Sequence, residues 1–429
     1  MNRFLLASIV FSVFVIQAEA QKLNHRQVKR IFDRSAILGE HFVGFILFDE
    51  DKEKIIYEEN STKYFLPASN TKLLTLYTAL HMLGDSIPAF RYVERGDSLI
   101  VWGTGDPTFL HNEFNSDHVM DFLRDHPKQL YLALDAEGTS LMEPSNWRAD
   151  VSAFPIAGNV AVVSAADDGQ LAAIPRRVSQ KLKQDTAYIS EKFNLKRSPV
   201  GVEMVYPLLP IPADFNTTVI YPVHADLTVA LLQDTLKRNV TRIGRSLPAD
   251  ARTFYSVRTD SLMKKMMLPS DNFLAEQILL LCASTLDSAL SIRTAIDYSL
   301  ENILKDLPQE IRWSDGSGLS RFNLFTPSTM IVLLGMIKEK IGNEDLLKDL
   351  LPAGGVSGTL KTAYKTDEGL PFVWAKTGTL TFAHLQSGLL TTRRGKKLRY
   401  SFMHNNFIRP TSEVREEMVR IMTEIHDRF

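Results

Sequence analysis

A serine and a lysine three positions apart, Ser69 and Lys72, could together form a nucleophile and its base. The residue pattern predicts a helix from about Ser69 to Leu83, which would place both side chains on one face, a turn apart. The free N–H groups at a helix start favour a developing negative charge. A neutral lysine can take the proton that otherwise keeps a serine hydroxyl unreactive. Such a pair arises often by chance, and a capping serine beside a surface lysine is the structural alternative.

Two further polar motifs fall at predicted element ends. Ser270-Asp271-Asn272 lies between two predicted helices, where a hydroxyl could pass a proton and an amide could hold a lysine, although a plain helix cap is the alternative. Lys376-Thr377-Gly378-Thr379 ends a predicted strand, where a glycine admits a substrate backbone and the polar side chains can grip a carboxylate. A β-turn is its alternative. The three motifs in this order are the signature of penicillin-binding proteins and serine β-lactamases.

Flanking motifs narrow this resemblance. They are Gly105-Asp106-Pro107-Thr108, the DGSGLSRFN run at 315–323 with Thr326-Pro327 after it, and the LPAGGVSGTL run at 351–360. With them the chain resembles the class C low-molecular-mass penicillin-binding proteins, the D-alanyl-D-alanine carboxypeptidase/endopeptidase family, over essentially the whole mature chain. The resemblance implies a transpeptidase-like domain with one or two β-rich domains inserted between the first two motifs. The interval from Lys72 to Ser270 is shorter than that family pattern suggests, which leaves the number of inserted domains open.

The resemblance also implies a reaction. Ser69 would attack the carbonyl between two D-alanines at the end of a peptidoglycan stem peptide, and Lys72 would accept its proton. Ser270 would relay a proton to the departing amine, with Lys376 supporting it electrostatically. Asn272 would orient Lys72 and the substrate amide, and water would then release the acyl group. β-Lactam antibiotics would react covalently at the same serine.

The substrate's terminal carboxylate would be held by the Lys-Thr-Gly-Thr motif, through Thr377 and Thr379 around Gly378. The backbone N–H groups of Ser69 and Thr379 would form the oxyanion hole. Lys72 must be neutral to act as a base, so we expect burial and a nearby second cation to lower its pKa. No metal or other cofactor is expected, because the ten histidines are scattered without a His-x-x-x-His pair.

The elements that must position these motifs follow from residue periodicity. They predict an α/β (α+β) fold with an antiparallel five-stranded sheet, a helical layer and an inserted β-rich part. The family resemblance implies that the sheet and the helical layer form a transpeptidase/β-lactamase-like domain. The predicted domains are the catalytic segments 21–89 and 222–429 and the insert 90–221. The predicted strands are 43–49, 54–58, 371–377, 385–391 and 399–405, and the predicted helices include 226–237, 257–267, 273–284, 292–304, 328–341 and 412–429.

Composition and the N-terminus bear on location and partners. Arg3, an apolar run from Phe4 to Ile16 and the small-x-small Ala18-Glu19-Ala20 predict a signal peptide at 1–20, hence export to the periplasm without a stable membrane anchor. A net charge of −1 without a dense basic block argues against a nucleic-acid partner. The single cysteine, Cys282, lies in an apolar helical run and is expected to be a buried hydrophobe.

Two rival functions share the three motifs. A serine β-lactamase needs a fast deacylation base, in class A enzymes a Glu followed four residues later by an Asn, and only Glu339 and Asn343 fit, beside Gly342 at an expected helix end. A non-catalytic penicillin-recognising sensor or scaffold would have kept the fold but lost the chemistry, which the intact motifs argue against. The balance between carboxypeptidase and endopeptidase activity, the preferred stem peptide and the oligomeric state are not specified by these patterns.

Overall fold

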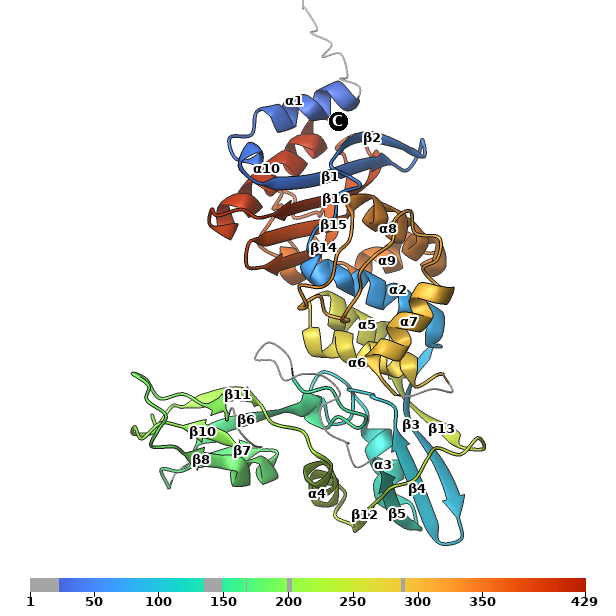
Figure 1. Ribbon diagram of the computed structural model, residues 1–429, viewed down its shortest axis with the longest axis vertical. Helices are drawn as coiled ribbons and strands as arrows, with labels where there is room; N and C mark the ends of the chain where they lie inside the picture. Colours follow the sequence, from blue (N-terminus) through green and yellow to red (C-terminus); the bar gives the residue numbers. More distant parts are fainter. Residues whose placement is uncertain (1–22, 135–148, 167, 199–202, 287–289) are drawn as a thin grey trace, which may run out of the picture.

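The computed structural model describes residues 23–134, 149–166, 168–198, 203–286 and 290–429. The predicted signal peptide at 1–20 lies outside these residues. Figure 1 shows one body that contains both chain ends of the described part and a second, β-rich part beside it that is formed by the middle of the chain. Within the described residues, no helix combines the length and the apolar character that crossing a membrane requires.

The predicted antiparallel five-stranded sheet is confirmed. Its strand order is β14-β15-β16-β1-β2, so strands from the two ends of the chain pair side by side. The strands are β1 (Phe42–Asp49), β2 (Lys54–Glu59), β14 (Val373–Leu380), β15 (Ala383–Thr391) and β16 (Lys397–Asn405). All but the last residue of β15 are buried, which fits a central strand covered by helices on both faces.

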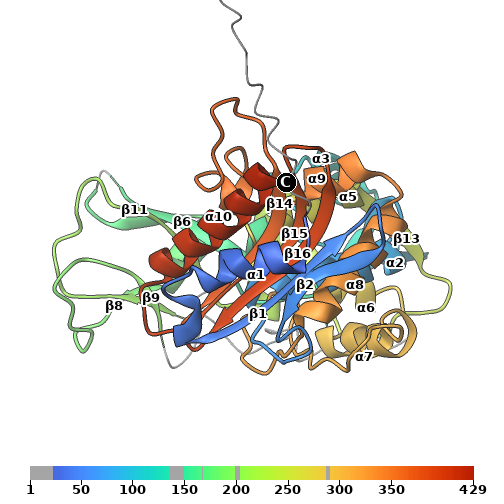
Figure 2. The same cartoon turned by 90° about the horizontal axis from the view of Figure 1, so that it is seen from above.

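Two terminal helices cover one face of this sheet. They are α1 (His25–Asp33) and α10 (Thr411–Arg428), and Figure 2 shows them lying over the sheet. The apolar stripe of the C-terminal helix predicts this docking, and Met418 and Ile421 pack with Phe45 and Phe402 of the sheet in one cluster. The helix at the chain end is therefore held by the core of the body that contains the five-stranded sheet β14-β15-β16-β1-β2, which is called the catalytic body below because it carries the three predicted motifs.

A layer of helices covers the other face. It consists of η2 (Ala68–Thr71), α2 (Lys72–Met82), α5 (Thr259–Met267), α6 (Asn272–Ala283), α7 (Ile292–Asn302), α8 (Pro327–Ile341) and α9 (Glu344–Leu350). Every residue of α6 from Phe273 to Ala283 is buried, including Cys282 as expected. A helix that is buried all round is held rigidly by its neighbours, which suits the element that begins with Asn272 of the Ser-Asp-Asn motif.

The β-rich part is built around a second five-stranded sheet of order β12-β5-β4-β3-β13. Its elements are β3 (Ser86–Arg95), β4 (Ser98–Gly103), α3 (Asp117–Asp125), β5 (Gln129–Ala133), α4 (Ala225–Leu236), β12 (Val240–Ile243) and β13 (Arg252–Arg258). This sheet thus begins before residue 90 and continues beyond residue 221, past both predicted limits of the insert. The predicted helix 226–237 exists as α4, but it packs in the core of the β-rich part and not in the catalytic body.

Two small sheets complete this part, with orders β11-β6-β7 and β8-β10-β9. Their strands and short helices are η3 (Ala157–Asn159), β6 (Val160–Ala165), β7 (Leu171–Ile174), η4 (Arg176–Lys181), β8 (Leu182–Gln184), β9 (Lys196–Arg197), β10 (Met204–Tyr206) and β11 (Asn216–Ile220). Helix α4 lies between these small sheets and the second five-stranded sheet (Figure 1).

Candidate active site

The turn that carries Ser69 is held tightly by its neighbours. Ser69 lies in η2, and Lys72 begins α2 directly after it. The preceding residue, Ala68, has a positive φ of 45°. Gly318 packs against this turn with a φ of +86°, and a Cβ there would lie 1.8 Å from the carbonyl oxygen of Ala68. Only glycine fits at that position, so the segment 315–318 packs directly against the turn that carries Ser69.

The amine of Lys72 contacts three oxygen atoms. Its Nζ lies 3.1 Å from Ser69 Oγ, 2.7 Å from Asn272 Oδ1 and 2.8 Å from the carbonyl oxygen of Ser317. A carbonyl and an amide oxygen can only accept hydrogen bonds, so they take the two N–H groups of a neutral amine. Its lone pair is then left for the hydroxyl of Ser69. This arrangement lets Lys72 receive the proton of Ser69.

The Ser-Asp-Asn motif divides its tasks among its three residues. The carboxylate of Asp271 accepts a hydrogen bond from Leu274 N at 2.8 Å and caps α6. The helix-cap alternative therefore applies to Asp271 alone, and Ser270 and Asn272 are available to the site. Ser270 has a φ of +65°, and its Oγ accepts a hydrogen bond from Lys376 Nζ at 2.8 Å.

Strand β14 lies beside the Ser69 turn at the edge of the main sheet. A Cβ at Gly378 would lie 2.8 Å from both the backbone nitrogen of Ser69 and the carbonyl oxygen of Pro67, so only glycine permits this approach. The neighbouring Thr377 hydroxyl lies 2.6 Å from that of Thr359, and the exposed Thr379 follows. The structure thus brings all three predicted motifs to one place.

The two lysines are fully buried, and burial changes their protonation. Desolvation lowers the pKa of Lys72 from 10.5 to about 8, although the charges of Glu276, Asp271 and Asp315 oppose the fall. The predicted direction is confirmed. Burial also lowers the pKa of Lys376 well below its ordinary value, and the charge of Lys72 lowers it further. The expected repulsion between the two amines thus contributes to the lowered pKa of Lys376.

Several residues that support the site were not predicted. Glu276 is fully buried, and its carboxylate accepts hydrogen bonds from Gly316 N at 2.7 Å and Ser317 N at 3.0 Å. It thereby fixes the carbonyl of Ser317 that contacts Lys72. A sequence signal existed, because Glu276 lies four residues after Asn272 on α6 and shares its helix face. Asp315 similarly accepts hydrogen bonds from Gly318 N at 2.8 Å and from the side chain of Asn323 at 2.7 Å.

His384 also touches the site. Its Nδ1 lies 2.8 Å from the hydroxyl oxygen of Thr379, across the β14–β15 pair. The only sequence signal for this contact is the register of the two strands, which residue types alone do not fix.

Glu339 and Asn343, the pair that fits the class A lactamase pattern, do not belong to this cluster. Glu339 is exposed near the end of α8, which ends at Ile341 before Gly342 with a φ of 65°. The side chain of Asn343 caps α9 by accepting hydrogen bonds from two backbone N–H groups. Both residues are thus parts of a helix end.

Comparison with known proteins identifies the relatives of this chain. A family model described as the D-Ala-D-Ala carboxypeptidase 3 (S13) family matches residues 25–134 and 219–425. D-alanyl-D-alanine carboxypeptidase DacB of Haemophilus influenzae is 32% identical over 155 residues, which are 34% of this chain and 31% of the relative. A carboxypeptidase of Mycobacterium tuberculosis is 34% identical over 172 residues, which are 37% of each chain. The chain thus spans about a third of the length of these curated relatives.

Solved structures share the fold over a larger part of the chain. Penicillin binding protein 4 from Haemophilus influenzae superposes with a TM-score of 0.70 at 20% identity, over 93% of this chain and 98% of that one. A penicillin G-acylated predatory endopeptidase from Bdellovibrio bacteriovorus gives 0.51 at 15% identity, over 90% of this chain and 92% of that one. At these identities the likeness concerns the fold.

Proposed function

The chain belongs to the D-Ala-D-Ala carboxypeptidase S13 family, the class C low-molecular-mass penicillin-binding proteins, and on this basis we propose that it cleaves D-alanyl-D-alanine peptide bonds of peptidoglycan stem peptides. The cleavage passes through an acyl-enzyme on Ser69. The observation that carries this proposal is the buried amine of Lys72, 3.1 Å from Ser69 Oγ, with two acceptor oxygens occupying its other hydrogen-bonding positions.

In the acylation step, Ser69 Oγ attacks the carbonyl carbon between the two D-alanines while its proton passes to Lys72 Nζ. The oxyanion that forms is stabilised by the backbone N–H groups of Ser69 and Thr379. The close approach of Gly378 to Ser69 N supports this pairing of donors. Thr377 and Thr379 hold the carboxylate next to the scissile bond.

In the departure step, the leaving amine needs a proton. Ser270 Oγ supplies it and receives in return the proton that Lys72 took from Ser69, while Lys376 Nζ donates a hydrogen bond to Ser270 Oγ at 2.8 Å. Because burial and the charge of Lys72 lower the pKa of Lys376, its part is that of a hydrogen-bond donor more than that of a permanent cation. Water then attacks the acyl carbonyl, the proton path runs in reverse, and Ser69 is released.

The same chemistry serves two bonds. Removing a terminal D-alanine and cutting a D-alanyl cross-link both break a peptide bond after D-alanine. In both substrates a carboxylate group lies next to the bond that is cut. We therefore assign both activities to one site, with penicillins as covalent inhibitors at Ser69. The substrate lies outside the cytoplasm, which agrees with the export predicted from residues 1–20.

Mass spectrometry of digests tests the proposal directly. The purified protein is incubated with monomeric pentapeptide muropeptides and with cross-linked dimers, and the products are weighed. We expect loss of one alanine from the monomers and conversion of dimers into monomers. A labelled penicillin should form a long-lived adduct on Ser69. Rapid turnover of penicillin would instead favour a β-lactamase, and failure of any covalent adduct would favour a sensor or scaffold.

A further inference from the structure

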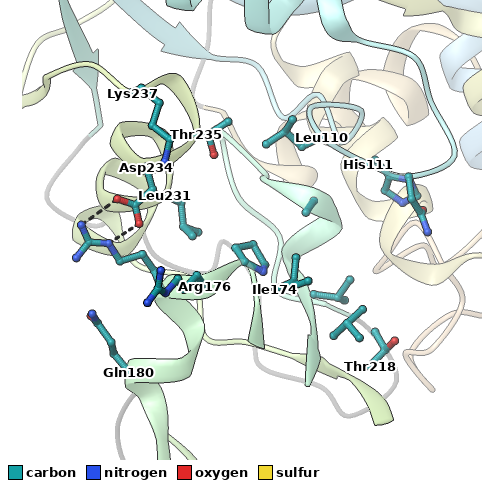
Figure 3. A pocket seen from close by; sticks show the side chains of 16 residues that line it. Leu110, His111, Ile174, Arg176, Gln180, Thr218, Leu231, Asp234, Thr235 and Lys237 are labelled. Carbon is teal, nitrogen blue, oxygen red and sulfur yellow. Dashed lines mark hydrogen bonds and ion pairs between the residues drawn. The ribbon is translucent and has the colours of Figure 1, made fainter. Parts of the chain in front are cut away.

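A cavity lies in the β-rich part, away from Ser69. We call it the insert pocket: it has a volume of about 830 Å³ and is bounded by η4, α4, strands β6 and β7, and the loop at 110–112. Figure 3 shows Lys237, Asp234 and Arg176 on one side of it and Leu110 and His111 toward the other. A volume of this size suits a peptide fragment or a similarly sized ligand. Much of its wall belongs to residues between 135 and 218, which the family model leaves unmatched.

The insert pocket is lined in part by large apolar side chains that are exposed to water. Three large apolar side chains that line it are Leu110, Val162 and Ile174, with exposed fractions of 37%, 42% and 75%. Grouped exposed apolar side chains mark surfaces that bind a partner or ligand. They favour an occupant that carries apolar groups.

Its charge is positive. Arg177 pairs with Asp234 through two hydrogen bonds of 2.6 and 3.0 Å, and this pairing holds the pKa of Asp234 below its usual value. Arg176 and Lys237 also act on the same carboxylate. Both are exposed, and neither forms an ion pair with another of the described residues. Three cations thus surround one carboxylate, which leaves a surplus for an anion.

The wall of the insert pocket comes near the helix that carries Asn272 of the Ser-Asp-Asn motif. His111 and Ala157 line the pocket, and a Cβ at the next residue, Gly158, would lie 3.1 Å from the His111 ring and 3.9 Å from the Phe273 ring. Phe273 directly follows Asn272 of the Ser-Asp-Asn motif. The insert pocket and the Ser-Asp-Asn motif are thus linked through the packing of Gly158 beside Phe273.

We propose that the insert pocket is a secondary subsite for peptidoglycan, which binds an acidic stem peptide while another part of the same cross-linked molecule lies at Ser69. This inference rests on the proposed function. Stem peptides carry free carboxylates, which suit Arg176 and Lys237, and alanine methyl groups, which suit the apolar wall at Val162 and Ile174. Binding at two places raises the effective concentration of a polymeric substrate at the catalytic cleft.

Charge reversal tests this subsite. In the variant Arg176→Glu/Lys237→Glu, we expect kcat/KM for purified cross-linked muropeptide dimers to fall on the order of tenfold, mainly through KM. Release of D-alanine from a short, soluble acyl-D-Ala-D-Ala peptide should stay unchanged, since it fills only the catalytic cleft. Val162→Glu, which puts a carboxylate on the apolar wall, should have the same selective effect. Lys52→Glu/Lys54→Glu, an equal charge change on the distant β1–β2 hairpin, is the matched control.

Each result decides the matter. A selective loss on dimers in both pocket variants, with normal labelling by penicillin, supports the subsite. Equal kinetics of the pocket variants and the wild type overturn it, and so does an equal loss on both substrates or the same loss in the Lys52→Glu/Lys54→Glu control. If the wild type cleaves neither substrate, it is the proposed function that fails. The subsite is then judged by binding of the dimer to Ser69→Ala with and without Arg176→Glu/Lys237→Glu.

Discussion

The catalytic cleft and the insert pocket both contain a pair of basic side chains, and the two pairs differ in their access to water. Lys72 and Lys376 are fully buried, contact oxygen atoms of the protein, and have lowered pKa values. Arg176 and Lys237 are exposed. A buried amine loses its proton within the physiological range and can exchange it, whereas an exposed cation keeps its charge and attracts anions. The difference in burial, more than the residue type, therefore suits the first pair to proton transfer and the second pair to binding of anions.

The two regions also differ in how closely they are packed. In the cleft, glycines at 318 and 378 let backbone segments approach so closely that no side chain would fit. The insert pocket is open, with apolar side chains left in contact with water. A preorganised site positions reacting atoms, and an open one tolerates several occupants. Substitutions in the cleft should therefore change the rate, and substitutions in the pocket should change binding.

Removing the nucleophile should give the largest effect and separates the two regions most clearly. Ser69→Ala should lower kcat on every substrate by on the order of 10⁴-fold or more, because no acyl-enzyme can form. Labelled penicillin should no longer attach. The melting temperature should stay close to that of the wild type, since the lost hydroxyl is only half-buried. Cross-linked dimers should still bind, and residual turnover within a hundredfold of the wild type would refute the assignment of Ser69.

Exchanging the base comes next. Lys72→Arg keeps a positive charge but cannot be deprotonated in a protein. The rate of acylation by penicillin should fall by about 10³-fold, within the usual range for loss of a general base. Arg176→Lys in the insert pocket makes a comparable exchange of one cation for another and should leave this rate unchanged. Comparable acylation rates for Lys72→Arg and the wild type would show that the amine of Lys72 takes no proton.

The pH profile of acylation reports on the same amine. With a pKa of about 8, Lys72 is protonated at lower pH and neutral at higher pH. The rate should therefore rise about tenfold per pH unit on the acid side and level off above pH 8. Stopped-flow measurement of penicillin acylation between pH 5.5 and about 9.5 gives the profile. An acid-side rise that ends near pH 10.5, the ordinary lysine value, would mean that burial does not activate this residue.

The sequence predicts the parts of the site that depend on the order of residues within one motif or element. It misses the parts that depend on how distant elements pair, such as the register of two strands. The three motifs fall at element ends that periodicity locates well, so Ser69, Ser270 and Lys376 could be placed before the structure. The support from Glu276 could be suspected only from its helix face. The domain limits were harder, because α4 is an amphipathic helix like those of the catalytic body. Its pairing with β-rich neighbours is a long-range contact that no local pattern encodes.

Loss of the contact between His384 and Thr379 should have the smallest effect of these changes. It tests whether a single buried hydrogen bond positions a substrate-binding hydroxyl. His384 is 2% exposed, and its Nε2 is buried with no hydrogen-bond partner among the described residues. An unpartnered buried N–H costs more than an unpartnered lone pair, so the proton belongs on Nδ1. Burial also lowers the pKa of the imidazole to about 3, so it stays neutral. Nδ1 then donates to Thr379 Oγ1, which leaves the threonine's own hydrogen for a substrate carboxylate.

Loss of this donor should weaken substrate binding and leave the chemistry nearly intact. In His384→Leu, the hydroxyl of Thr379 is free to rotate, and KM for an acyl-D-Ala-D-Ala peptide should rise about fivefold, as for one lost hydrogen bond. The value of kcat should change less than twofold. His384→Asn keeps an N–H close to the position of Nδ1 and should restore KM. An equal rise in both variants, or a loss confined to kcat, would show that His384 merely fills space, whereas recovery in His384→Asn alone shows that a single buried donor orients the carboxylate-binding hydroxyl.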